Sequence, residues 1–511
     1  MKRLESLVVV IGNNLYSINA SVLILGMRCA AGLAKCPLKA MEKSLPVIAR
    51  QILDIIKQSG NTESELVQVA FKSLATILRD GPSVQVKEKD LVFLIELLSP
   101  DLEESTRQAS VFTLLRAIGA RKFVVPEIYD LMEKVSEVAV TSQSPQVQEL
   151  CRGVLLQFLL DYPQGKGRLR NQMAFFAKNI SYVHESGRTS IMELLDAVIT
   201  KFQVNLVREY ADLLFVALVM VVANDDSAKC REMAAHLIKN LFTRLDGDHR
   251  NIVLSHLHSW ASQKAQPQLT WVSAQVSGFI VDVAQSEVLP YVSVILGDLK
   301  ASLQCSATAT IIDEDEDDSR MDVELEWQLP YHALTVLSKI LRVFPAFVNE
   351  DDKVGWNLVV AHLLFPHAWV RTAACRLLGL LFSTVPVALF CPDLPDDHPL
   401  SKCGMINAAN KLSQQLKSEH LDDILSLQIV KNLFYLGKCF YLFPVGNEDE
   451  SAAHPEDGSS SEDKLKQLNN PLSWLFSKLS YQVKSGHIAR RNRAACKVRS
   501  LFARNLIFIF D

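Results

Sequence analysis

Apolar side chains recur along the chain in a pattern that repeats about every forty residues. Seven residues beyond each of eight reference positions lies an apolar side chain, and ten residues beyond lies another, except at Asp282. Offsets three apart trace one stripe of an α-helix, the stripe that packs against a neighbour. Each reference position therefore predicts the first turn of a helix, and the positions are Gln68, Arg107, Glu149, Arg188, Arg231, Val272, Pro330 and Arg371.

Further helical segments lie between these helices, such as LVFLIELL at 91–98 and IYDLMEKVSEVAV at 128–140. Two helices in each period of about forty residues are typical of HEAT and armadillo repeats. The sequence therefore predicts an all-α, HEAT/armadillo-like α-solenoid of stacked antiparallel helix pairs. FVALVMVV at 215–222 has the valine content of a strand, but the repeat places it in the first helix of a pair. Its valines lower helix propensity only slightly, so we expect a helix there.

Two segments interrupt the repeat. One interval between reference positions is long because it contains IIDEDEDDSRMDVELE, residues 311–326, whose six consecutive acids at 313–318 predict an inserted loop. NEDESAAHPEDGSSSEDK at 447–464 has the composition of a disordered linker. We therefore expect a repeat array over residues 1–442, an acidic, serine-rich linker over 443–465 and a basic helical segment over 466–511.

Composition narrows the class of protein. Of 511 residues, 49% are hydrophobic and 22% are charged, which is typical of folded chains. The 53 basic and 57 acidic residues give a net charge of −4, so only local patches of cations can indicate nucleic-acid binding. The most apolar run, at 216–223, is too short to span a bilayer, and Asn13 and Asn14 interrupt the N-terminal apolar run. We expect no membrane partner, and no disulfides among the ten cysteines.

Motifs for catalysis or cofactor binding are not evident. QGKGR at 164–168 has a lysine between glycines but lacks the spacing and the Ser or Thr of a nucleotide-binding loop. Cys391, His398 and Cys403 lack the close ligand pairing of zinc sites, and His256 and His258 point apart on a helix. We therefore expect no catalytic residues, no metal, no cofactor and no small-molecule substrate.

Clustered cations are the stronger signal. Lys166, Arg168, Arg170 and Lys178 lie across a loop and the helix that follows it, and Arg188 opens the next helix. A helix start carries unpaired N–H groups and the positive end of the helix dipole, so cations there favour an anion such as phosphate. The alternative is a structural junction in which these cations pair with acids such as Asp161. The sequence leaves both interpretations open.

A second basic segment, HIARRNRAACKVRSLFARN, lies near the end of the chain. It could follow an RNA backbone, because phosphate contacts supply most sequence-independent affinity, or form a solvated face of the last repeat. Its candidate RNA contacts are Arg490, Arg491, Arg493, Lys497 and Arg499. Upstream, Ser459, Ser460 and Ser461 precede two acids, a pattern typical of acid-directed phosphorylation and equally of a solvated linker.

Three segments support a family resemblance: YPQGKGRLRNQMAFFAKNISY at 162–182, GRTSIMELLDAVI at 187–199 and NDDSAKCREMAAHLIKNLF at 224–242. They closely resemble the family of the twentieth "U three protein", also called down-regulated in metastasis, over about residues 40–440. The resemblance implies the C-terminal region of a nucleolar and nuclear, non-enzymatic HEAT-repeat scaffold of the small-subunit processome. Its implied partners are processome proteins, the U3 snoRNP and pre-rRNA, and its implied role is in 18S rRNA processing and 40S subunit biogenesis. The alternative is a HEAT-repeat protein–protein adaptor without RNA binding.

The ends of the chain depart from that family. Members of the family end in a lysine-rich tail and extend much further towards the N-terminus, whereas this sequence ends in FARNLIFIFD. We therefore expect a truncated or alternative form. Because terminal repeats need polar outer faces, we also expect residues 466–511 to be poorly soluble.

Overall fold

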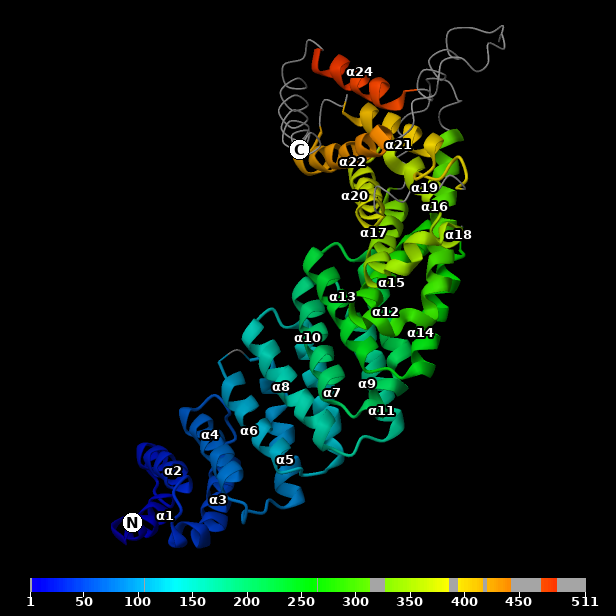
Figure 1. Cartoon of the computed structure of the whole chain (residues 1–511). Helices are drawn as coiled ribbons and strands as arrows, with labels where there is room; N and C mark the ends of the chain where they lie inside the picture. Colours follow the sequence, from blue (N-terminus) through cyan, green and yellow to red (C-terminus); the bar gives the residue numbers. More distant parts are fainter. Residues whose placement is uncertain are drawn as a thin grey trace, which may run out of the picture. The chain divides into compact units, whose positions relative to one another are not determined.

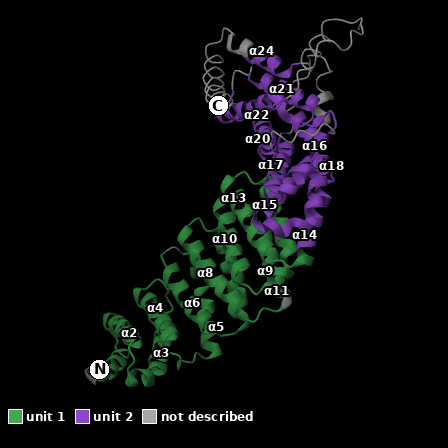
Figure 2. Cartoon of the chain, in the orientation of Figure 1, with its two compact units in different colours: residues 1–249 green, residues 250–511 purple. Residues whose placement is uncertain are grey.

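Helices make up all of the regular structure in the part of the chain that is described. The computed structural model describes residues 2–104, 106–263, 265–312, 327–385, 394–416, 421–442 and 470–484, and within these ranges every regular element is an α-helix or a 3₁₀ helix. The segment FVALVMVV lies within α12 (Ala211–Asn224), so the helical interpretation is confirmed. The chain divides into two compact units, residues 1–249 and 250–511, shown in green and purple in Figure 2.

The first unit consists of helix pairs arranged in two layers (Figure 1). The second helices of the pairs contact one another in succession, and they are α2 (Ala20–Ala34), α4 (Glu65–Asp80), α6 (Gln108–Ala120), α8 (Pro145–Asp161), α10 (Glu185–Lys201) and α13 (Ala228–Thr243). The first helices form the other layer, and they are α1 (Lys2–Asn14), α3 (Lys39–Ser59), α5 (Glu88–Leu98), α7 (Pro126–Thr141), α9 (Lys166–Asn179) and α12. Short connections are η1 (Pro100–Leu102) and α11 (Val204–Glu209).

The second unit repeats this arrangement with longer connections. Its successive second helices are α15 (Pro267–Ala284), α17 (Gln328–Val343), α20 (Ala368–Thr384) and α22 (Asp423–Leu442), and neighbouring helices in this series pack together. The division between the units falls within α14 (Gly247–Ala261). The remaining elements are η2 (Gln285–Tyr291), α16 (Val292–Ile312), η3 (Pro345–Asn349), α18 (Asp351–Val354), α19 (Trp356–Ala361), η4 (His362–Leu364), α21 (Lys402–Gln415) and α24 (Pro471–Lys484). The predicted HEAT-like stacking of helix pairs is confirmed.

A recurring side-chain hydrogen bond ties the turn inside a pair to the second helix. In α4, the Gln68 side-chain amide donates to the carbonyl of Thr62, six residues earlier in the preceding turn, at 2.6 Å. The same bond is made by residues near the start of α6, α8, α10, α13 and α20, namely Gln108, Gln148, Arg188, Arg231 and Arg371. We call these six side chains the turn clamps. They satisfy carbonyls that would otherwise lack a partner in the turn.

The turn clamps correct the register of two reference positions. The clamps in α6 and α8 are Gln108 and Gln148, whereas the apolar spacing predicts Arg107 and Glu149 at those positions. The shift explains why Leu156 is only half-buried, whereas Leu155 is 1% exposed. Burying a leucine side chain contributes about 1.5–3 kcal/mol to the free energy of folding, which favours the register that the clamps show.

Several predicted segments lie partly or wholly outside the described residues. Ile311 and Ile312 of the expected loop belong to α16, and residues 313–326 lie outside the described ranges. The expected linker at 443–465 also lies outside them, and α24 is the described part of the expected C-terminal segment.

One apolar stretch corrects the expectation about membrane spans. Residues Pro267–Ala307 are long and apolar enough to cross a bilayer by length and composition. They comprise α15, η2 and residues 292–307 of α16, and η2 contains Pro290. Because α15 packs against α17 and buries side chains such as Val272 and Ile280, α15 is a helix of the repeat core.

Candidate functional site

The start of α9 holds the first group of predicted phosphate contacts. Gly165 occupies the N-cap without a capping side chain, and Lys166, whose side chain lies outside the described part, is the first helical residue. The Arg168 guanidinium carbon lies 4.1 Å from the centroid of the Tyr129 ring. The Tyr129 hydroxyl donates to the carbonyl of Pro163 at 2.9 Å, so this ring holds both the loop and the arginine.

Arg168, Arg170 and Lys178 are all exposed. None of the ion pairs formed within the described ranges involves them, and Asp161, their expected structural partner, pairs with Lys122 at 3.0 Å. Arg168 and Arg170 are two helical positions apart and therefore point to opposite sides of α9. The structure thus presents the three cations along the helix, with Arg168 towards α7, and not as one compact anion pocket.

Arg188 lies in a different environment. Its side chain is 9% exposed and forms an ion pair of 2.9 Å with Asp225, which is 5% exposed. It also pairs with Asp226 at 2.9 Å and donates to the carbonyls of Tyr182 and Val183. Arg188 therefore joins two successive repeats, and its guanidinium is not part of the exposed candidate surface.

The C-terminal candidates and two other predicted features lie outside the described residues. These are Arg490, Arg491, Arg493, Lys497 and Arg499, together with Cys391 and the serines at 459–461.

The histidines singled out from the sequence have separate partners. His398 is buried, and its Nδ1 accepts from the backbone N–H of Leu400. His256 stacks on Trp260, and His258 contacts Asp298. Burial lowers the pKa of His398 below its usual value. Within the described ranges, no three His, Cys, Asp or Glu side chains are grouped closely enough to hold a metal ion.

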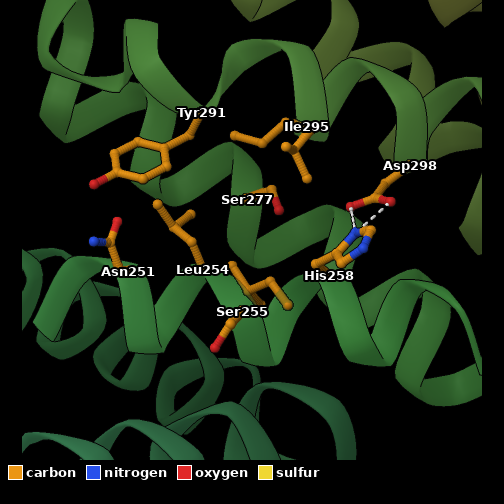
Figure 3. Close-up of a pocket in the computed structure, with 10 residues that line it drawn as sticks. Asn251, Leu254, Ser255, His258, Ser277, Tyr291, Ile295 and Asp298 are labelled. Atoms are coloured by element: carbon orange, nitrogen blue, oxygen red, sulfur yellow. Dashed lines mark hydrogen bonds and ion pairs between the residues drawn. The ribbon is translucent and has the colours of Figure 1, made fainter. Parts of the chain in front are cut away.

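A mainly apolar pocket of about 210 Å³ lies between α14, α15 and α16. Figure 3 shows the His258–Asp298 pair at one end of it, and Tyr291 and Asn251 at the other. His258 Nδ1 lies 2.9 and 3.0 Å from the two oxygens of Asp298, whose pKa burial raises.

Such a pair can orient a general base, but the base also needs a nucleophile within hydrogen-bond reach. The nearby Ser255 hydroxyl donates instead to the carbonyl of Ile252 at 2.7 Å. Among the described side chains, no hydroxyl or thiol is hydrogen-bonded to the His258 imidazole, since the Ser262 hydroxyl donates to the backbone carbonyl of His258 instead. The geometry of this pocket does not assemble a catalytic triad.

A cluster of aromatic side chains was not predicted from the sequence. Trp327 and Tyr331 at the start of α17 meet His367 and Trp369 at the start of α20. Beside the cluster lies a cavity of about 420 Å³ that also contains arginines. The signal was available in WQLPYH at 327–332 and HAWVR at 367–371, because stacked repeats bring equivalent helix starts together.

Comparison with curated proteins gives two relatives. The chain is 33% identical over 444 residues to the U3 small nucleolar RNA-associated protein 20 of Schizosaccharomyces pombe, covering 86% of this chain and 17% of the relative. The protein of the same name from Saccharomyces cerevisiae is 31% identical over 396 residues, covering 75% of this chain and 15% of the relative. The chain belongs to this family. It spans about one sixth of the length of the U3 small nucleolar RNA-associated proteins 20 that it matches.

Other comparisons add little to the assignment of the U3 small nucleolar RNA-associated protein 20 family. No protein-family model matches the chain. Solved structures that resemble it include Kap121p bound to Pho4p, with 14% identity, a TM-score of 0.49 and coverage of 99% of this chain and 47% of that one. Importin β is 12% identical with a TM-score of 0.38, and the match covers 97% and 57% of the two chains. Likenesses this weak carry no information about partners.

Proposed function

We propose that the chain is a non-enzymatic scaffold segment in ribosome biogenesis, acting in the small-subunit processome in the nucleolus. In this role it associates with the U3 snoRNP, with processome proteins and with pre-rRNA, and it supports 18S rRNA processing and 40S subunit biogenesis. The observation that carries the proposal is the 33% identity, over 86% of this chain, to a protein named for its association with U3 small nucleolar RNA. Stacked helix pairs supply the extended surface that such a role requires.

The exposed cations of α9 are the proposed RNA contacts in the first unit. Arg168, Arg170 and Lys178 have no acidic partner in the described part of the chain, so their charge is available to phosphate. Cationic side chains on the nucleic-acid backbone release condensed counterions, which makes the affinity fall as salt rises. Lys166 and the C-terminal cations Arg490, Arg491, Arg493, Lys497 and Arg499 remain predictions of further contacts.

The test replaces Arg168, Arg170 and Lys178 together with Ala and measures binding of a U3 snoRNA or pre-rRNA fragment at several salt concentrations. We expect weaker binding and a salt dependence that is shallower by about 0.7–0.9 units of logarithmic slope for each lost phosphate contact. The matched control replaces the exposed Lys43, Arg50 and Lys72, which lie on α3 and α4, with Ala.

Two outcomes contradict the proposal at different levels. If the salt dependence of RNA binding is unchanged in the α9 variant while the control variant binds RNA more weakly, other cations make the RNA contacts. If the unaltered chain binds no RNA at physiological salt, the RNA part of the proposal is wrong and the protein–protein adaptor alternative stands.

A further inference from the structure

The cavity between α17 and α20 is lined by two matching stripes of side chains. From α17 come Tyr331, Thr335, Ser338 and Arg342, and from α20 come Trp369, Thr372, Ala373 and Arg376. These spacings of three and four residues place each set on one helix face. Leu334, fully buried, forms the floor. We call this cavity the aromatic–arginine groove.

One end of the groove is an aromatic platform. Trp369 is 56% exposed, which is unusual for the largest apolar side chain. Its ring stands edge-on to Trp327 at a centroid distance of 4.9 Å and is tilted against Tyr331 at 5.9 Å. These contacts leave part of the tryptophan surface open to the groove.

The platform is fixed by its neighbours. His367 stacks flat on Trp327 at 4.3 Å, and its Nδ1 accepts from the backbone N–H of Trp369 at 3.3 Å, which caps α20. A side chain held in this way loses little conformational freedom when a ligand binds, so the groove is preorganised.

The other end of the groove carries unpaired positive charge. Arg342 and Arg376 are exposed, and no ion pair within the described ranges involves either of them. Lys339, which also lines the groove, is already paired with Asp282 at 2.8 Å. Asp422 is the acid on the rim, and it forms no ion pair with the arginines. Two free guanidinium groups facing one carboxylate leave the groove cationic, which favours an anionic ligand.

An open aromatic face beside two unpaired arginines matches the chemistry of single-stranded nucleic acid. Proteins bind single strands by stacking unpaired bases on aromatic rings while arginine or lysine side chains follow the phosphates. Along α17, Tyr331 and Arg342 are eleven residues apart, or about 16 Å at the helical rise, which is long enough for a short run of nucleotides. A duplex, whose bases are already stacked on each other, offers no free face to Trp369.

We propose that the aromatic–arginine groove binds a single-stranded RNA segment, with an unpaired base on Trp369 and Tyr331 and phosphates on Arg342 and Arg376. This inference deepens the proposed function and rests on it, because it names the form of RNA and the residues of the second unit that hold it. It concerns residues different from those on α9.

The experiment uses the full chain and a fluorescently labelled twelve-nucleotide oligouridine as the probe. Trp369→Ala is expected to weaken binding roughly tenfold or more, since one stacked base is lost. Trp369→Phe should retain most of the affinity, and circular dichroism establishes that both variants are folded. Arg342→Gln with Arg376→Gln should lower the logarithmic salt slope by about 1.4, at roughly 0.7 for each phosphate on a single strand, whereas the double lysine variant keeps the slope.

Ultraviolet cross-linking of an iodouridine-containing probe should place the adducts on Trp369 or Tyr331. Equal affinity for a duplex of the same length, or unaltered binding by both the Trp369→Ala and the double glutamine variants, overturns the inference. Tighter binding of an acidic peptide than of RNA, lost in the same variants, assigns the groove to a protein partner and also overturns it. If the α9 variant loses affinity and the groove variants do not, this inference is wrong while the proposed function stands.

Discussion

At the scale of single residues, burial decides which charged groups serve the fold and which remain available. Arg168 and Arg188 are both arginines near the start of a helix, and the sequence made both candidates for either phosphate contact or a structural junction. The structure leaves Arg168 exposed on the Tyr129 ring and buries Arg188 against Asp225. The difference arises because the turn before α13 brings Asp225 against α10, a contact between successive repeats.

His332 gives a prediction about pH. It stacks on Trp271, and burial lowers its pKa to about 4 from the usual 6.5. The unfolded chain therefore binds one more proton than the folded chain between pH 6.5 and 4, so stability falls as the pH drops through this window. We expect His332 to account for a loss of about 2 kcal/mol in the free energy of unfolding of the second unit between pH 7 and pH 5.

His332→Phe removes the titrating group while keeping a ring against Trp271. Urea unfolding of the variant should depend less on pH across this window than unfolding of the unaltered chain. An identical pH dependence of the two proteins would show that His332 does not titrate in this way.

At the scale of elements, the turn clamps make each second helix depend on the turn before it. Arg188→Met leaves the carboxylate of Asp225, which is 5% exposed, without its ion-pair partner. Removing one member of a buried ion pair costs about 3–5 kcal/mol, because the remaining charge is uncompensated. We expect hydrogen exchange in α10 and α13 to accelerate by the corresponding factor.

Arg231→Met is the matched control. Arg231 donates to the carbonyls of Asp225 and Asp226, so its removal leaves no buried charge behind. The expected loss is about 0.5–1.5 kcal/mol for each hydrogen bond. Equal effects of the two substitutions would show that the ion pair of Arg188 adds nothing to the clamp.

Much of the arrangement of helices was predictable from the sequence. Apolar spacing located the second helices because each must bury one stripe, and it resolved the helical identity of α12 despite its valines. The register of Gln108 and Gln148 was missed by one residue, since apolar stripes are broad while the clamp is a single polar contact. The aromatic–arginine groove was also missed. It arises only when α17 and α20, whose starts are forty residues apart, lie side by side.

At the scale of the molecule, contacts between helices join mainly neighbouring pairs within each unit, as in repeat proteins. A fragment of residues 1–246 ends before α14 and retains every helix pair from α1 to α13. We expect it to fold independently, with helical circular dichroism and cooperative urea unfolding. A fragment of residues 1–226 is the control. It retains α12 without α13, exposes apolar side chains such as Leu218 and Val222, and should aggregate.

One second helix has an aromatic residue at the position that carries a turn clamp in others. The fourth residue of α17 is Tyr331, whereas the fourth residue of α8, α10, α13 and α20 is a glutamine or arginine clamp. Tyr331 lines the aromatic–arginine groove. One position of the repeat thus serves internal bonding in four helices and contributes a ring to an open surface in a fifth.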